Sequence, residues 1–500
     1  MSPPDGGHTM QTVRALSVAL IATFALAAAG CGSGDVGAGA GPSPATQLKP
    51  GALVYWETVS DSDSDQWQQA EDLLRRFPDG DKWIARLRQL VADQGVDWEQ
   101  DVKPALGETT AAAVYSQSGE QGPQVVALTN PDDPDKAVAL VAKLDERSGG
   151  DPTVSRVVGD WVVVSESEAA IAAALKPANG GSLADDAGFN SAMDELPDDA
   201  LTRLYADPAA ALAAFGSADQ DAAGALKMLG FDRLDFAGAW AKAKDNGAEL
   251  ALALSGEGAA RLLGTGEPYS SALLDRVPAD AFAFVSFQGR PATRQFEEFQ
   301  RNPLYSMGFQ EFERQLGIKF ADLVALFDGE VAFYARPAVP IPELTLLLDS
   351  ANAQEARASA ENLLRAVART EGAEVTEDGN VTTAVFDNFT VNLGALEGMV
   401  VLTTSKRALA DLAESGDKLP DSDRYKAALD AAGAPDEYTG LAYADLAETV
   451  ELIQGYLAFA GRSEKLPGDV ARNLEPLKSL VTWGTREGDV ASAQAFVEID

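Results

Sequence analysis

One segment of the chain occurs twice, 238 residues apart, and this repeat constrains the fold more than any other feature of the sequence. Residues 197–207 have the sequence PDDALTRLYAD, and residues 435–445 have the sequence PDEYTGLAYAD. At the same spacing, the apolar run Trp161–Ser165 (WVVVS) matches Met399–Thr403 (MVVLT). Two matches with one offset indicate an internal duplication, so we predict that the two halves of the chain share one fold.

A third pair of segments repeats with a different offset. Residues 95–108 and 317–330 have equal length, and each begins with Gly and ends with Gly-Glu, but the second starts 222 residues after the first. The two units therefore differ by an insertion between the matched segments.

The N-terminus has the pattern of an export signal. A basic residue precedes a run of apolar residues, and small residues then lead to Cys31, the only cysteine of the chain. Residues 26–31 (LAAAGC) resemble a bacterial lipobox, in which the chain is cleaved before the cysteine and its sulfur is lipidated, although Ala28 stands where leucine is usual. We predict a lipoprotein signal peptide over 1–30 and lipidation at Cys31. The alternatives are a plain secretory peptide with an incidental cysteine and a transmembrane anchor, which needs about 20 apolar residues, more than this run provides.

The remaining sequence divides by composition and by the repeats. Residues 31–47 are rich in Gly, Ser, Pro and Ala, which predicts a flexible tether. We predict a first α+β unit over 48–255, a junction over 256–271 and a second α+β unit over 272–500.

Both units are predicted to be mainly antiparallel sheet covered by helices. The short apolar runs at Trp161–Ser165 and Met399–Thr403 have the length and composition of strands buried on both faces. Between such runs lie segments whose apolar residues recur at the spacing of one helical face, and we predict that these segments are helices. Each unit ends in a predicted hairpin, at 235–254 and at 480–499, with Gly in the turn. The pattern leaves open whether the two units share one sheet.

Composition excludes several classes of function. The net charge of −38 disfavours nucleic acid and anionic lipid headgroups as direct partners. The only histidine, His8, lies in the signal region, so the mature chain lacks the groups for Ser-His-Asp catalysis, Cys-His catalysis and the usual zinc sites. We predict no metal and no cofactor. The tryptophans fall mostly within periodic apolar segments and are predicted to pack in the core rather than to form a sugar-binding platform.

Two local patterns resemble functional sites and are explained more simply. The acids of 61–65 (DSDSD) begin like a calcium loop, but Gln66 stands where the turn needs glycine, so we predict an acidic loop that leads into a helix N-terminus. Ser415 and Lys418 have Ser-x-x-Lys spacing, yet the chain contains no Lys-Thr-Gly, so chance explains this match.

The acids that end the repeated motif, Asp207 and Asp445, recur in matching places after a strand and could suggest catalysis. Pro208 follows the first, and Glu448 stands three residues after the second. Proline is favoured at the first position of a helix, and an acid is favoured at the third. We therefore interpret both aspartates as helix N-caps and predict no catalytic residue.

Several motifs together resemble a known family. They are 95–98 (GVDW) with Gly107-Glu108, 159–165 (GDWVVVS), 182–185 (SLAD) and 204–207 (LYAD). They resemble the bacterial exported-protein family catalogued as the domain of unknown function DUF3352, and the resemblance covers most of the mature chain. It implies a shared fold, but no activity and no functional residues.

These observations lead to one functional expectation and two alternatives. We expect an extracytoplasmic envelope protein that is anchored to the cell membrane by lipid at Cys31, does not catalyse a reaction, and binds an envelope partner or has an architectural role. The first alternative is a carrier of a lipid or other apolar ligand. A hydrolase is the last of the three hypotheses.

Overall fold

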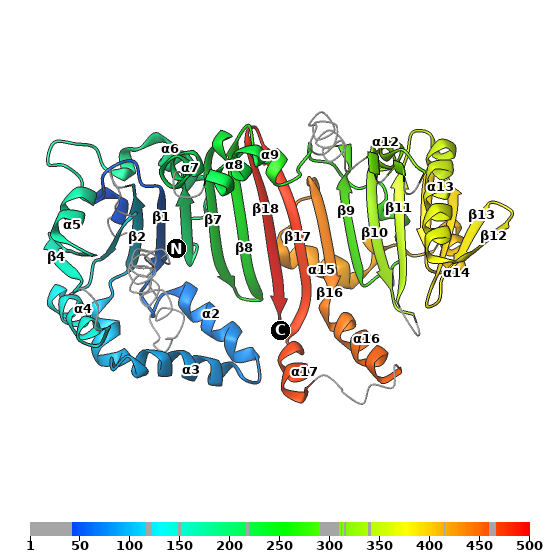
Figure 1. The fold of residues 1–500 in the computed structure, drawn as a ribbon. Coiled ribbons are helices and arrows are strands. Elements are labelled where there is room, and N and C mark those ends of the chain that lie inside the picture. The colour runs from blue at the N-terminus through cyan, green and yellow to red at the C-terminus, as the bar shows by residue number, and fades with distance from the viewer. Residues whose placement is uncertain are drawn as a thin grey trace, which may run out of the picture. The chain divides into compact units, whose positions relative to one another are not determined.

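The structure is a computed structural model that describes residues 43–116, 123–148, 152–216, 220–290, 310–311, 313–314, 317–338, 342–414, 416–459 and 467–500. The chain divides into unit 1, which ends at Ala259, and unit 2, which begins at Ala260. Both are built from helices and antiparallel strands (Figure 1), so the predicted α+β class is confirmed.

The described part of unit 1 contains one antiparallel sheet. Along the sheet the strands follow the order β4, β5, β3, β2, β1, β6, β7, β8. Their bounds are β1 (Val54–Val59), β2 (Thr109–Tyr115), β3 (Gln124–Thr129), β4 (Val154–Val158), β5 (Trp161–Ser165), β6 (Thr202–Ala206), β7 (Leu234–Lys244) and β8 (Gly247–Gly256).

Helices and short turns connect these strands. The helices are α2 (Asp65–Arg76), α3 (Gly80–Asp93), α4 (Pro134–Ser148), α5 (Glu168–Ala174), α6 (Ala187–Asp194), α7 (Pro208–Phe215) and α8 (Gln220–Leu229), and α9 (Ala259–Leu262) lies at the unit boundary. The short turns are η1 (Pro44–Thr46), η2 (Trp98–Val102), η3 (Lys103–Ala105), η4 (Leu183–Asp185) and η5 (Phe231–Arg233).

The described part of unit 2 contains strands in the order β12, β13, β14, β15, β11, β10, β9, β16, β17, β18, all antiparallel. Their bounds are β9 (Ala283–Gln288), β10 (Glu330–Arg336), β11 (Glu343–Asp349), β12 (Glu374–Asp378), β13 (Val381–Val385), β14 (Thr390–Leu396), β15 (Met399–Thr403), β16 (Gly440–Asp445), β17 (Leu477–Glu487) and β18 (Val490–Ile499).

The helices described in unit 2 are α12 (Phe320–Ala325), α13 (Ala353–Glu371), α14 (Lys406–Ala413), α15 (Asp423–Ala432), α16 (Leu446–Phe459) and α17 (Gly468–Leu474). The described part of unit 2 also contains the single turns η6 (Leu274–Arg276) and η7 (Leu419–Asp421).

Among the described strands, the order is the same in the two units apart from the hairpin β12–β13, which lies at one end of the unit 2 strands. Strands β1 to β3 take the places of β9 to β11, β4 and β5 those of β14 and β15, and β6 to β8 those of β16 to β18. The repeated apolar runs form β5 and β15. Val162 and Val163 in β5 and Val400 and Val401 in β15 are fully buried, which confirms that both faces of these strands are covered.

The single turns η4 and η7 are also alike. Each carries a buried leucine, Leu183 or Leu419. The amide of Leu183 donates to the carbonyl of Leu48 at 2.8 Å, and the amide of Leu419 donates to that of Val277 at 2.8 Å. Each turn therefore fixes the chain segment that leads toward the first strand of its unit.

The predicted tether ends earlier than the sequence indicates. Residues 43–47 contain the turn η1, whose Ala45 is fully buried and which packs against η4. The prediction of a tether was wrong for these residues because the apolar contact of Ala45 outweighs the flexibility suggested by composition.

Part of the predicted junction also belongs to the fold of unit 2. Tyr269 forms a backbone bridge with Tyr438, and the hydroxyl of Ser271 bonds to the buried carboxylate of Glu330. The signal peptide 1–30, Cys31 and the tether up to residue 42 lie outside the described residues. Within the described part of the chain, no helix has the length and apolar character needed to cross a membrane.

Candidate functional site

Unit 1 contains an apolar cavity of about 100 Å³ between its sheet and the layer formed by α4, η2 and η3. The described residues that line it are aliphatic or threonine: Val91, Val96, Val102, Ala105, Leu106, Thr110, Ala127, Leu128, Thr129, Ala137, Leu140, Val141, Leu144, Val162 and Val164. None of these side chains is titratable, so this lining suits an apolar molecule and offers no general acid or base.

Helix α4 forms one wall of the cavity. Its apolar residues Ala137, Leu140, Val141 and Leu144 recur at the spacing of one helical face, and proline occupies its first position. Ala137 is buried, whereas Leu140, Val141 and Leu144 are half-buried. A single helix therefore separates the cavity from solvent on this side.

The turn η2 forms part of a second wall and has an unusual backbone. The amide of Val102 donates to the carbonyl of Asp97, five residues earlier, at 3.1 Å, which makes η2 a π-turn. The Oδ1 atom of Asp97 caps the turn by accepting from the amide of Gln100 at 2.8 Å. Turns of this kind are rare and occur often at functional sites.

An ion pair joins the two walls. Lys143 on α4 pairs with Asp101 on η2, and the amide of Asp97 donates to the Oδ2 atom of Asp101 at 2.7 Å. The hydrogen bond from the Asp97 amide, followed by that from Lys143, lowers the pKa of Asp101. The charged pair lies outside the apolar lining and holds α4 against η2.

The hydroxyl groups of the cavity lining have partners within the protein. The Oγ1 atom of Thr129 accepts from the amide of Gly107 at 3.1 Å, and Thr110 donates to Thr129 at 3.5 Å. The polar atoms of the lining are thus used in local bonds.

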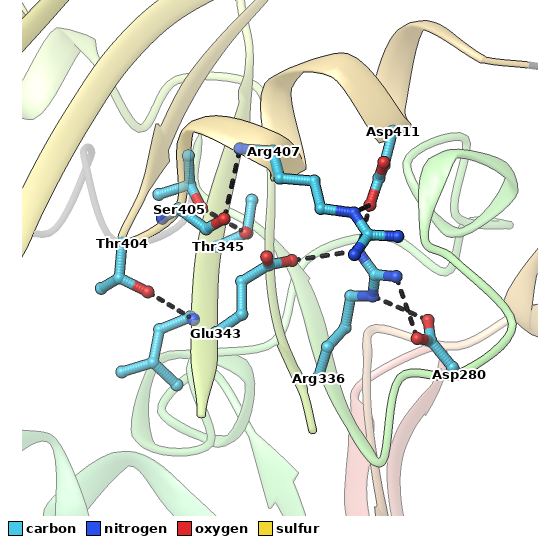
Figure 2. Close-up of polar contacts among 10 residues, drawn as sticks. Asp280, Arg336, Glu343, Thr345, Thr404, Ser405, Arg407 and Asp411 are labelled. Carbon is cyan, nitrogen blue, oxygen red and sulfur yellow. Dashed lines mark hydrogen bonds and ion pairs between the residues drawn. The ribbon is translucent and has the colours of Figure 1, made fainter. Parts of the chain in front are cut away.

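Unit 2 contains a dense charged cluster around Arg336, at the end of β10 (Figure 2). The guanidinium bonds to both carboxylate oxygens of Asp280, with Nε–Oδ1 at 2.7 Å and Nη2–Oδ2 at 2.9 Å. Its Nη1 atom donates to Asp411 at 2.7 Å and to Glu343 at 3.1 Å. Figure 2 shows these carboxylates around the guanidinium of Arg336. The Nε atom of Arg407 also lies 3.6 Å from the Oδ2 atom of Asp411.

Burial and hydrogen bonding act in opposite directions on the charge of Arg336. Burial opposes the charge of Arg336, but its hydrogen bonds to Asp280 and Asp411 outweigh this effect and raise its pKa. The hydrogen bond from Arg336 in turn lowers the pKa of Asp411. Because Arg336, Glu343 and Asp411 come from β10, β11 and α14, the cluster fastens these three elements together. Its groups are bonded to one another, which fits a structural role.

The repeated acids lie where the sequence predicts them. The Oδ1 atom of Asp207 accepts from the amide of Ala210 at 2.8 Å, and the Oδ1 atom of Asp445 accepts from the amide of Glu448 at 2.9 Å. The interpretation of both as helix N-caps is confirmed.

The acidic loop at 61–65 leads into α2, as predicted. Asp63 pairs with Lys103 at 3.1 Å, and the Oδ1 atom of Asp61 accepts from the amide of Asp63 at 2.9 Å. Across the described residues, no group of three or more acidic, histidine or cysteine side chains is arranged to hold a metal ion. Ser415 lies outside the described residues, and Lys418 directly precedes η7.

Sequence reasoning missed both the cavity and the Arg336 cluster. The apolar face of α4 was visible in its spacing, but the volume beneath it depends on side chains from several strands. The partners of Arg336 are separated from it by 56, 7 and 75 residues, so no local pattern connects them.

Comparison with known proteins gives one family and distant structures. A family model described as "Protein of unknown function (DUF3352)" matches residues 146–498. No curated protein matches the sequence. Crystal form I of TP0453 is 14% identical with a TM-score of 0.24, covering 45% of this chain and 79% of that chain. Crystal form III of TP0453 is 13% identical with a TM-score of 0.24, covering 47% of this chain and 94% of that chain. These similarities are too weak to carry an argument.

Proposed function

The chain belongs to the DUF3352 family of proteins of unknown function, and we propose that it is a lipid-anchored envelope protein that binds a partner or has an architectural role without catalysing a reaction. The observation that supports the non-catalytic part of this proposal is the use of Asp207 and Asp445 as helix N-caps. These acids recur in both units at matching places, which could suggest catalysis, yet each is bonded to its own helix.

The proposed location rests on Cys31, at the end of the export signal. Lipidation of this sulfur would anchor the mature chain to the outer side of the cell membrane. The test is membrane fractionation and intact mass of the full chain and of Cys31→Ala. We expect the variant to lose membrane retention and the added lipid mass. Unchanged mass and retention would contradict the lipoprotein proposal.

We also propose that the two units arose by duplication. The common strand order supports this, as do the equivalent bonds of Leu183 and Leu419 to the segments that precede β1 and β9. An experimental structure in which β5 and β15 have non-equivalent neighbours would contradict the proposal.

A second candidate function is the transport of an apolar ligand. The cavity beneath α4 favours it, because its lining is aliphatic and its two hydroxyl groups have local partners. Mass spectrometry of protein purified from its native membrane tests this candidate, since a carrier should retain a stoichiometric apolar molecule.

A further inference from the structure

We infer that the cavity beneath α4 is a binding site for the end of a hydrocarbon chain. This inference rests on the binding role proposed above and names the class of ligand. The site belongs to unit 1 and is formed by α3, α4, η2, η3 and the strands β2, β3 and β5.

The lining selects against polar ligands. A hydrogen-bonding or charged group placed among Val102, Leu140 and Val162 would lose its water without gaining a partner, which is strongly unfavourable. The cavity of about 100 Å³ is somewhat smaller than an engineered apolar cavity of about 150 Å³ that binds benzene or xenon. It can therefore accept the last few carbons of a chain, while any polar head remains outside.

The equivalent place in unit 2 has larger residues on the sheet. In unit 1, Ala127 and Thr129 of β3 pair with Val164 and Val162 of β5. In unit 2, Leu346 and Leu348 of β11 pair with Leu402 and Val400 of β15.

The two leucines of β11 belong to the apolar cluster in which α13 takes part. Helix α13 follows β11 as α4 follows β3, so the two helices stand at equivalent places in their units. The sheet thus carries smaller residues in unit 1 than in unit 2 at these places, while α4 carries Leu140 and Val141 where α13 carries mainly alanines.

The π-turn η2 supplies an independent observation. Its Val102 lines the cavity, and the carbonyl of Asp97 accepts both from the amide of Asp101 at 2.9 Å, as in a regular helix, and from the amide of Val102 at 3.1 Å. Such π-type bonding is rare in proteins and is frequent at functional sites. The presence of a π-turn beside an apolar cavity therefore favours a ligand site.

The experiment uses the full chain carrying Cys31→Ala, which removes its own proposed lipid. The probes are xenon, followed by xenon NMR, and pentane, 1-dodecanol and a dodecanoyl lysophospholipid, followed by thermal unfolding. We expect xenon to enter the cavity and the chain-bearing probes to raise the melting temperature in a saturable way. Stabilisation by pentane and dodecanol but not by the lysophospholipid would assign the site to free apolar molecules. Stabilisation by the lysophospholipid would assign it to lipid.

The decisive variant is Ala137→Leu, which places extra side-chain volume in the cavity. Its matched control is Ala142→Leu, the same substitution at an exposed position of α4. We expect Ala137→Leu to weaken binding of xenon and chains by about tenfold or more, and Ala142→Leu to leave binding unchanged. If Ala137→Leu does not fold, Thr129→Leu fills the cavity from the sheet with the residue that unit 2 carries at the equivalent place.

Three outcomes would overturn the inference. Failure of xenon to enter would mean that the space is not accessible. Entry of xenon without saturable binding of any chain would mark a packing defect only. Equal chain binding by a folded filled variant would place the site elsewhere. None of these results depends on Cys31, so membrane retention of the unmodified chain still tests the proposed location separately.

Discussion

Arg424 donates a hydrogen bond of 2.7 Å to the Oδ2 atom of Asp445, so the acid that ends the second repeat is held by a cation as well as by its helix. Its other oxygen caps α16 through the amide of Glu448, and Arg424 also bonds to the Glu448 carboxylate at 3.0 Å. The equivalent Asp207 caps α7 through the amide of Ala210. The two repeats therefore share the cap but differ in the charges around it.

Because of this difference, we predict that Asp445→Ala lowers the free energy of unfolding more than Asp207→Ala does. We expect Asp207→Ala to lower the free energy of unfolding by about 1 kcal/mol, the usual value of an N-cap. Asp445→Ala should cost about 2 kcal/mol, because it also removes a charge-assisted bond from a buried carboxylate. Urea unfolding measures both values, and Asp207→Asn, which keeps a capping oxygen, is the control. If either alanine variant abolished cellular function at unchanged stability, the capping role would not be sufficient.

Arg336 provides a second test of stability. Removing its guanidinium leaves Asp280, Glu343 and Asp411 without their common partner, and Glu343 is buried. We expect Arg336→Met to destabilise unit 2 by about 3 kcal/mol, mainly because it takes the guanidinium away from the buried carboxylate of Glu343. Asp280 is half-exposed and Asp411 keeps Arg407, so these two acids contribute less.

Arg336→Lys is the control for Arg336→Met. Lysine keeps the positive charge but cannot make the paired bonds to Asp280, so its effect should be intermediate. Equal stability of the methionine variant and the unmodified protein, measured by chemical unfolding, would show that the cluster contributes nothing.

Strands were predicted well because apolar runs are local. The runs at Trp161–Ser165 and Met399–Thr403 and the two terminal hairpins all lie where the sequence places them. Hairpin β12–β13 was missed because β12 is mostly exposed and carries Glu374, Glu377 and Asp378, so it lacks an apolar face.

Side-chain burial was predicted less completely. Five tryptophans, Trp67, Trp98, Trp161, Trp240 and Trp483, are buried as expected. Trp83 is 39% exposed and instead lies beside Phe77, while the next residue, Ile84, turns inward. Helical spacing predicts which residues share one face of a helix. It does not determine how far the helix is rotated about its own axis, so the residue next to the expected one can face the core. The cavity could not be predicted at all, because it depends on differences in side-chain volume between equivalent strands.

The free energy of unfolding should fall as the pH is lowered, because two aspartates have a lower pKa in the folded chain than in the unfolded one. Hydrogen bonds hold the pKa of Asp101 and of Asp411 below the usual value, so each binds a proton more weakly in the folded chain. Their contribution is therefore present above the pKa of an unfolded aspartate, about 3.9, and is lost as the pH falls through the lower folded value. Urea unfolding between neutral pH and pH of about 3 should show this loss, and Asp411→Asn should make the dependence shallower. An identical slope for the variant would contradict the assignment.

Substitution of Gly107 or of Gly329 should destabilise the fold. The two glycines lie at equivalent places in the two units, and a backbone carbonyl oxygen stands close to each. A Cβ atom at Gly107 would lie 2.2 Å from the carbonyl oxygen of Asn130, and one at Gly329 would lie 2.3 Å from that of Asp349. Asn130 directly follows β3 and Asp349 is the last residue of β11, and both atoms are backbone oxygens, so the backbone itself must move to accept a methyl group. We expect each glycine-to-alanine variant to lose about 2 kcal/mol or more of unfolding free energy.

The matched control for the two glycines is Gly224→Ala. Gly224 lies inside α8, and a Cβ atom there would meet nothing within 4 Å. Alanine favours the helix and restricts the unfolded chain, so this variant should gain up to about 1 kcal/mol. If alanine lowers the unfolding free energy at Gly107 and Gly329 but raises it at Gly224, the loss of stability comes from the close approach of the backbone and not from the loss of glycine as such. If Gly107→Ala and Gly329→Ala differed widely in effect, the two positions would not be equivalent, and the case for duplication would lose one of its supports.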